Sequence, residues 1–130
     1  ELVDGGEAVV QLVHQRVELD VGSLQSMLGD GVGPKPVLVD VREAYEARMS
    51  PTDELAPEAV PLSALINALP RWRALPEQTP VIFFCRSGNR SAQAARALRR
   101  LGHGQAWSLA GGLALWPTTR TATTLDAIAI

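Results

Sequence analysis

Two short continuous apolar runs in this chain are typical of buried strands. Val81–Phe84 and Val37–Val41 are rich in β-branched and aromatic residues, and only Asp40 interrupts the second run. Apolar runs of this length predict central strands of a parallel sheet. The segment Ser91–Leu101 differs, because its apolar residues recur every three or four positions. This spacing predicts an amphipathic helix with an apolar stripe at Ala94, Ala97, Leu98 and Leu101.

Weaker patterns elsewhere continue the alternation of strands and helices. Short strands are predicted at Val17–Leu19 and Gln105–Leu109. Helices are predicted around residues 24–28, with Asp20 or Ser23 as the N-cap, and at 62–75. A further helix is predicted to open at Asp40–Glu43 and to run through Arg48. Within residues 62–75, Pro70 predicts either two short helices or one kinked helix. Strands that alternate with helices predict an α/β fold, in which a parallel sheet is covered on both faces.

The two ends of the chain are set apart from this alternation. Residues 1–16 are predicted to form an N-terminal extension or a linker helix, with helical spacing at Glu7–Arg16. Residues 118–130 form a threonine-rich tail to which no structure is assigned. Before the tail, Gly111 and Gly112 predict a tight turn into a short helix that ends near Trp116. Residues 17–117 are therefore predicted to form one domain.

Cys85 lies where the predicted strand at 81–84 gives way to the predicted helix. Backbone N–H groups at a helix N-terminus are unpaired and carry the positive end of the helix dipole. Such a position binds anions and lowers the pKa of a thiol. Arg86 and Arg90 add two positive charges, and Gly88 allows the backbone to curl. The pattern predicts a thiolate surrounded by hydrogen-bond donors.

Three motifs, in the same order along the chain, resemble those of the rhodanese family of sulfurtransferases. Cys85–Arg90 (CRSGNR) is similar to the family's Cys-x-x-Gly-x-Arg loop between a strand and a helix. Leu38–Glu43 (LVDVRE) resembles its Asp-Val-Arg segment, and Ser108–Trp116 (SLAGGLALW) resembles its Gly-Gly-x-x-x-Trp ending. The combination is far more specific than any one of these motifs. The resemblance implies a rhodanese-like fold with a five-stranded parallel sheet and helices on both faces.

The resemblance also implies an activity and a set of site residues. Cys85 would accept a sulfane sulfur as a persulfide and pass it to a thiol, including a protein thiol, or to cyanide. The donor would be a small anion, thiosulfate or a persulfide, and no metal or organic cofactor is needed. The implied catalytic residue is Cys85, the substrate-binding residues are Arg86, Ser87, Gly88, Asn89 and Arg90, and the loop-supporting residues are Asp40 and Arg42.

Two features leave alternatives open. Asp40 and Glu43 have the spacing of a helix-capping box, which is an alternative to a supporting role for Asp40. Leu55–Ala59 (LAPEA) stands where the family usually has His-Ile-Pro-Gly-Ala, so Glu58 replaces a glycine. This departure is expected to change the cleft wall and the access of acceptors rather than the nucleophile.

The distribution of charge favours an anionic substrate. The net charge is −2, but residues 1–60 carry twelve acidic and four basic side chains, whereas residues 81–130 carry one acidic and six basic. A positive field around Cys85 would attract small anions. Arg99 and Arg100 are expected to be solvated on the predicted helix. No basic stripe with interleaved aromatic residues indicates nucleic-acid binding, and no apolar run approaches the roughly 20 residues of a membrane span.

The single cysteine limits the function classes further. It excludes an internal disulfide framework and a multi-cysteine zinc site, and it fits a reducing compartment, so a cytoplasmic location is expected. A cysteine phosphatase is one rival, but its loop has five residues between cysteine and arginine, whereas four separate Cys85 from Arg90 here. A non-catalytic rhodanese-like binding module is another rival, although such modules often lack the cysteine. Within the loop, Arg86 is expected to hold the donor and Arg90 to shape the loop.

Overall fold

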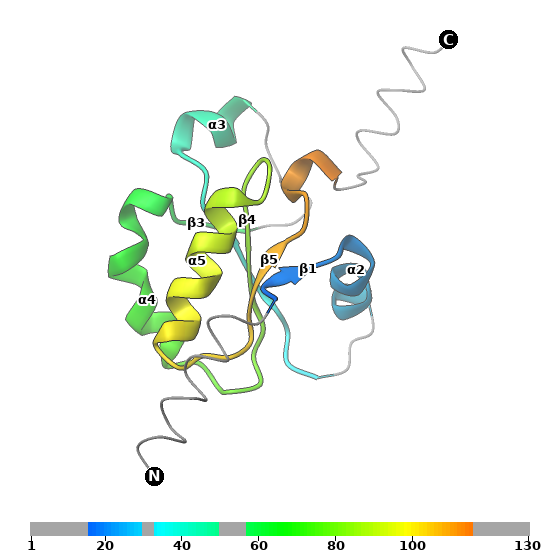
Figure 1. The fold of residues 1–130 in the computed structure, drawn as a ribbon, viewed down its shortest axis with the longest axis vertical. Helices are drawn as coiled ribbons and strands as arrows, with labels where there is room; N and C mark the ends of the chain where they lie inside the picture. The colour runs from blue at the N-terminus through cyan, green and yellow to red at the C-terminus, as the bar shows by residue number, and fades with distance from the viewer. Residues whose placement is uncertain (1–15, 30–32, 50–56, 116–130) are drawn as a thin grey trace.

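The computed structural model describes residues 16–29, 33–49 and 57–115, which form a five-stranded parallel sheet (Figure 1). The strand order is β1-β5-β4-β2-β3, and every pairing is parallel. This confirms the predicted α/β fold with a five-stranded sheet. The strands are β1 (Glu18–Leu19), β2 (Val37–Asp40), β3 (Glu58–Ala59), β4 (Val81–Phe84) and β5 (Ala106–Leu109).

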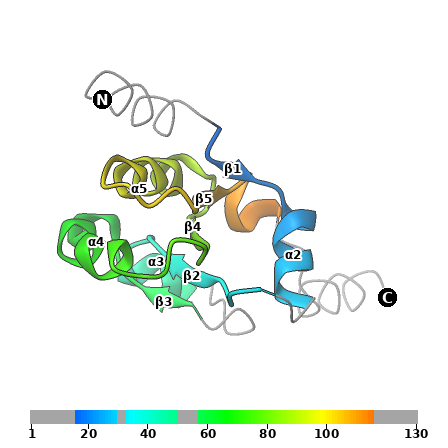
Figure 2. The same cartoon turned by 90° about the horizontal axis from the view of Figure 1, so that it is seen from below.

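Helices cover both faces of the sheet, as Figure 2 shows from below. On one face lie α4 (Leu65–Arg73), which follows a 3-10 turn at Leu62–Ala64, and α5 (Asn89–Arg100). On the other face lies α2 (Val21–Gly29), while the short α3 (Ala44–Met49) follows β2. A second 3-10 turn, Gly112–Leu115, follows β5. The carboxyl ends of β2, β4 and β5 therefore meet the starts of α3, α5 and this turn.

The central strand β4 divides the core into two layers. Val81 and Phe83 belong to the layer under α4 and α5, whereas Ile82 and Phe84 belong to the layer under α2, and all four side chains are fully buried. Trp72 of α4 meets the ring of Phe83 edge to face, with centroids 5.2 Å apart. Both faces of β4 are thus buried, as its continuous apolar run predicts.

The helix ends differ in detail from the sequence predictions. Asp20, one of the two predicted N-caps of α2, accepts the Ser23 N–H at 2.6 Å. The helix α5 begins at Asn89, two residues before the predicted start. The helix α4 continues through Pro70, and the break lies earlier, at the 3-10 turn before Leu65. Pro70 is the sixth residue of α4 and has no N–H, so the helix lacks one backbone hydrogen bond at this position.

The capping box predicted from Asp40 and Glu43 is wrong. Asp40 is the last residue of β2, and its carboxylate binds Arg42. The helix α3 starts at Ala44, and the Glu46 side chain accepts the Glu43 N–H at 3.0 Å. Capping therefore occurs three residues later than predicted, which leaves Asp40 available to pair with Arg42.

The expectation that Arg99 is solvated is also wrong. Its side chain is only 2% exposed, and its Nε donates to the Ala106 carbonyl at 2.9 Å. The guanidinium lies 4.7 Å from the centre of the Trp107 ring, so a cation–π contact contributes as well. Burial lowers the pKa of Arg99. Arg100, in contrast, is exposed as predicted.

Glu58, at the predicted departure from the family pattern, has a clear packing role. Its carboxylate pairs with Arg71 at 2.6 Å and accepts the Trp72 indole N–H at 3.3 Å. Glu58 lies beside Val39 in the sheet, so its side chain is on the α4 face. The described part of this segment therefore connects the edge strand β3 to α4.

Other sequence predictions lie outside the described residues. They concern the helix predicted at 7–16 (apart from Arg16), the tail at 118–130, Trp116, and Leu55 and Ala56 of the departing segment. The limits of the predicted domain remain predictions. No helix within the described ranges is long and apolar enough to cross a membrane.

Candidate active site

Cys85 follows β4 directly and is enclosed by its own loop. The Gly88 N–H donates to the Cys85 Sγ at 3.0 Å, and the Ser91 Oγ lies 3.5 Å from the same sulfur. Gly88 adopts the left-handed conformation (φ 103°) as the N-cap of α5. A residue with a Cβ rarely adopts this conformation, so the glycine allows the loop to fold back over the sulfur. Of the donors predicted around Cys85, the Gly88 N–H is therefore in place, and the Ser91 hydroxyl lies beside it.

The thiol of Cys85 is tuned toward its charged form. Burial is the largest single influence and raises the pKa, but hydrogen bonds from the Ser91 hydroxyl and from the Ser91, Gly88 and Ser87 N–H groups outweigh it. The pKa of Cys85 is consequently lower than that of an ordinary thiol. A larger fraction is thiolate near neutral pH, which is the form that acts as a nucleophile.

The turn after β5 supports the loop from the other side. The Leu113 N–H donates to the Cys85 carbonyl at 2.9 Å. Gly112 (φ 59°) approaches so closely that a Cβ there would overlap the Cys85 carbonyl oxygen and lie 2.6 Å from the Arg86 carbonyl oxygen. The Gly111–Gly112 turn predicted from the sequence thus has a second function, since Gly112 is in contact with the backbone of the active loop.

Arg90 is held by a residue that the sequence analysis did not identify. Its Nη1 and Nη2 donate to Oε1 and Oε2 of Glu46 at 2.6 and 2.7 Å, a bidentate pair between α5 and α3. This pairing, followed by the Glu43 N–H, lowers the pKa of Glu46 to about 2, and it raises the pKa of Arg90. The predicted loop-shaping role of Arg90 has a geometric basis in this pair.

Asp40 and Arg42 form a buried ion pair next to the loop. The Arg42 Nη2 lies 2.9 Å from the Asp40 Oδ2, and both side chains are less than 5% exposed. Val41 donates its N–H to the Phe84 carbonyl, which places the pair beside the end of β4. The Arg42 Nη1 also donates to the Glu46 carbonyl at 3.4 Å. A chain of contacts therefore runs from Asp40 through α3 to Arg90.

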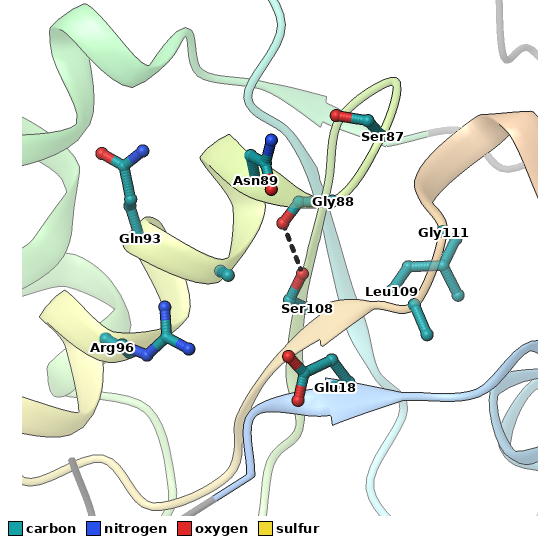
Figure 3. A pocket seen from close by; sticks show the side chains of 11 residues that line it. Glu18, Ser87, Gly88, Asn89, Gln93, Arg96, Ser108, Leu109 and Gly111 are labelled. Carbon is teal, nitrogen blue, oxygen red and sulfur yellow. Dashed lines mark hydrogen bonds between the residues drawn. The ribbon is translucent and has the colours of Figure 1, made fainter. Parts of the chain in front are cut away.

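The remaining predicted site residues are on the outside of the loop. Arg86, Ser87 and Asn89 are exposed, and Arg86 has no ion-pair or hydrogen-bond partner among the described residues. Ser87 and Asn89 line a pocket of about 610 Å³ between α5 and the ends of β1 and β5 (Figure 3). Cys85 is not among the residues that line this pocket.

Four residues of the site were not assigned to it from the sequence: Glu46, Ser91, Ser108 and Gly112. Glu46 has the Glu-x-x-Glu spacing with Glu43 that caps a helix, but no pattern indicates that it pairs with Arg90. Ser91 lies in the first turn of α5, six residues after Cys85, so its hydroxyl can be expected near the sulfur once the loop and the start of the helix are predicted. Ser108 comes near Cys85 only through the pairing of β4 with β5.

Cys85 is a buried free cysteine at the junction of a parallel strand and a helix in an α/β domain. The model of the rhodanese-like domain family matches residues 20–119. The chain belongs to this family.

Similar proteins agree with the assignment. A protein named sulfurtransferase from Allochromatium vinosum is 33% identical over 99 residues, which cover 76% of this chain and 86% of that protein. The human single-domain sulfurtransferase TSTD1 is 31% identical, with a TM-score of 0.58 over 74% of this chain and 90% of the human one. RPA3614 of Rhodopseudomonas palustris, described as a possible tyrosine phosphatase, shares the fold at 19% identity, with a TM-score of 0.65 over 88% of this chain and 87% of that one.

The pairing of Glu46 with Arg90 predicts a specific pH dependence of stability. The pKa of Glu46 falls from 4.5 to about 2 on folding. A lowered carboxyl pKa stabilises the fold above the unfolded value, and this contribution is lost as the pH falls toward the folded value. We therefore expect the urea midpoint of the native chain to drop more between about pH 5 and pH 2 than that of Glu46→Gln.

Glu77→Gln is the matched control, because it makes the same chemical change at an exposed glutamate. Its curve should follow that of the native chain. If Glu46→Gln shows the same loss of stability over this range as the native chain, the ion pair does not contribute in solution.

Proposed function

We propose that this chain is a sulfurtransferase that carries a sulfane sulfur on Cys85 from thiosulfate or a persulfide to a thiol or cyanide. The Cys85 thiolate attacks the outer sulfur of thiosulfate, the new S–S bond forms, and sulfite leaves with the electrons of the broken bond. The acceptor then attacks the terminal sulfur, and the Cys85 thiolate leaves. The observation that carries the proposal is the buried Sγ with the Gly88 N–H 3.0 Å away.

The hydrogen bonds to Sγ suit both half-reactions. In the first, they increase the fraction of thiolate. In the second, Cys85 is the leaving group, and a thiol of lower pKa leaves faster. Donors that are already positioned need no reorganisation when charge develops on sulfur. Cys85 itself is fully buried, so its sulfur is shielded from bulk water.

The phosphatase alternative fits the loop less well. A phosphoryl group has three equatorial oxygens and needs a wide ring of donors with an arginine fork. Here the loop has four residues between Cys85 and Arg90, and both terminal nitrogens of Arg90 donate to Glu46. A non-catalytic role is disfavoured because the cysteine is present and its pKa is lowered.

A comparison of turnover with two substrates tests the proposal. We expect thiocyanate to form from thiosulfate and cyanide, and an aryl phosphate to stay at background. A third assay uses a persulfide as the sulfur donor and a thiol as the acceptor. It is included because the physiological donor and acceptor can differ from thiosulfate and cyanide. Aryl phosphate hydrolysis without sulfur transfer in any assay would replace our proposal with the phosphatase.

Arg86 is expected to bind the anionic donor. It is exposed, lies next to Cys85, and has no partner in the described part of the chain. We expect Arg86→Gln to raise the KM for thiosulfate about tenfold while kcat changes little, since a charge-assisted hydrogen bond is worth roughly 1.5 kcal/mol. Arg100→Gln, which removes an equal charge at the far end of α5, should leave KM unchanged.

The salt dependence of the KM is a second test of the contact between Arg86 and the anionic donor. The KM of the native chain should rise with ionic strength, because attraction between exposed charges is screened over about 10 Å at 0.1 M salt. An equal rise in KM from Arg86→Gln and Arg100→Gln would mean that only the overall charge matters.

A further inference from the structure

Ser108 of β5 is the third member of a buried chain of polar groups that begins at Cys85. The Ser91 Oγ lies 3.5 Å from Sγ and 2.7 Å from the Ser108 Oγ. Ser91 is fully buried and Ser108 is 1% exposed. The Ser108 Oγ also lies 3.4 Å from the Gly88 carbonyl oxygen, the contact drawn in Figure 3. Both hydroxyl groups thus lie near the Gly88 carbonyl, and only the Ser91 hydroxyl contacts the sulfur.

The direction of these hydrogen bonds decides whether the sulfur receives a proton donor from Ser91. Each hydroxyl has a single proton. Ser91 has a competing acceptor, because its Oγ lies 3.1 Å from the Gly88 carbonyl, which already accepts the Ala92 N–H. When Ser108 donates to Ser91, the Ser91 hydroxyl becomes a stronger donor, because hydrogen bonds in a chain polarise one another. The Ser91–Ser108 distance of 2.7 Å is that of a hydroxyl–hydroxyl hydrogen bond, in which either oxygen can be the donor.

We propose that Ser108 is a positioning residue that directs the Ser91 hydroxyl at the Cys85 sulfur and forms the outer end of the path by which the thiol proton leaves. On ionisation the proton of Sγ passes to Ser91, the proton of Ser91 passes to Ser108, and the proton of Ser108 passes to water. Both serines are neutral before and after the transfer. In the thiolate state Ser108 donates to Ser91, and Ser91 donates to Sγ.

The position of Ser108 fits the outer end of this path. Of the three residues, it alone lines the pocket of about 610 Å³ between α5 and the strand ends. Glu18, its partner in the parallel pairing of β1 with β5, lines the same pocket. In Figure 3 the Glu18 carboxylate and the Ser108 hydroxyl come from neighbouring strands.

Charged groups near the chain of hydroxyls come from several elements. Carboxylates and guanidinium groups keep their charge between about pH 6 and pH 9, so they form a constant background for a thiol that titrates in this range. These groups are Glu18 of β1, Arg96 and Arg90 of α5, Glu46 of α3, Arg86 of the loop, and the Asp40–Arg42 pair after β2.

The pH dependence of alkylation by iodoacetamide measures the proposed effect directly. The chain has one cysteine, so the reaction reports on Cys85 alone. We expect Ser108→Ala to raise the pH midpoint by roughly 0.5 unit, the size of one modest hydrogen bond. Ser108→Thr keeps the hydroxyl and should keep the native midpoint, whereas Ser108→Val, which has a similar volume, should shift it. If Ser108→Ala does not fold, the comparison of Ser108→Thr with Ser108→Val tests the proposal instead.

A double-mutant cycle separates this role from simple packing. Ser91→Ala should raise the midpoint, and adding Ser108→Ala should raise it no further, because Ser108 acts through Ser91. The proposal is overturned if Ser108→Ala and Ser108→Val both keep the native midpoint, or if the shift is equally large without Ser91. The role of Ser108 rests on Cys85 being the nucleophile of the proposed sulfur transfer. The alkylation assay needs no sulfur donor, so the role of Ser108 and the sulfur transfer can each fail without the other.

Discussion

Cys85→Ser will lose sulfur transfer while remaining folded. Serine is nearly isosteric with cysteine, and its hydroxyl can accept the Gly88 N–H that now binds Sγ. An alkoxide is far less accessible than a thiolate at neutral pH, and oxygen cannot form the persulfide. We expect turnover of thiosulfate with cyanide to fall by at least about a thousandfold, with stability changed by about 1 kcal/mol or less.

Circular dichroism and thermal melting establish that the variant is folded before turnover is compared. The matched control is Ser63→Ala, which removes a hydroxyl from an exposed turn and a single contact with Glu43 at 3.3 Å. It should keep native turnover. Retained sulfur transfer in folded Cys85→Ser would show that another group is the nucleophile.

Gly112→Ala will be almost as damaging, although Gly112 contributes no side chain to the chemistry. The new Cβ would overlap the Cys85 carbonyl oxygen and lie 2.6 Å from that of Arg86, and both are backbone atoms that cannot rotate away. The loop must shift, and with it Sγ. A misplacement of about 1 Å near reacting atoms costs roughly a hundredfold in rate, which is the loss we expect.

Gly33→Ala isolates the effect of the clash from that of the backbone conformation. Gly33 is also left-handed (φ 79°), but a Cβ there would meet no atom within 4 Å. Both variants pay the conformational cost of roughly 1 kcal/mol, and only Gly112→Ala should lose activity. Equal activity in the two variants would mean that the loop tolerates displacement.

Much of this fold could be predicted from the sequence because its signals are local. The runs at Val37–Val41 and Val81–Phe84 are apolar on both faces, and they form the strands β2 and β4 with ends within one residue of the prediction. The position of Cys85 between β4 and α5 follows from these boundaries. The number of strands came from the family resemblance, because the two-residue strand β3 has too few residues for a pattern.

What could not be predicted depends on contacts between segments that are distant in the chain. Arg99 is buried because the Ala106 carbonyl and the Trp107 ring lie over it, and a helical pattern contains neither. Glu46 meets Arg90 across 44 positions, and Ser108 meets Ser91 across 17. These contacts depend on how helices and strands are placed, so spacing along the chain does not reveal them.

The mass of the intact chain after exposure to thiosulfate shows whether Cys85 carries a sulfane sulfur. We expect a gain of one sulfur atom, located on Cys85 by peptide mapping, and a return to the starting mass when cyanide is added. Cys85→Ser should gain nothing under the same conditions. If the native chain is folded and reduced, yet gains no sulfur from thiosulfate or from any persulfide donor, then Cys85 is not a sulfur carrier.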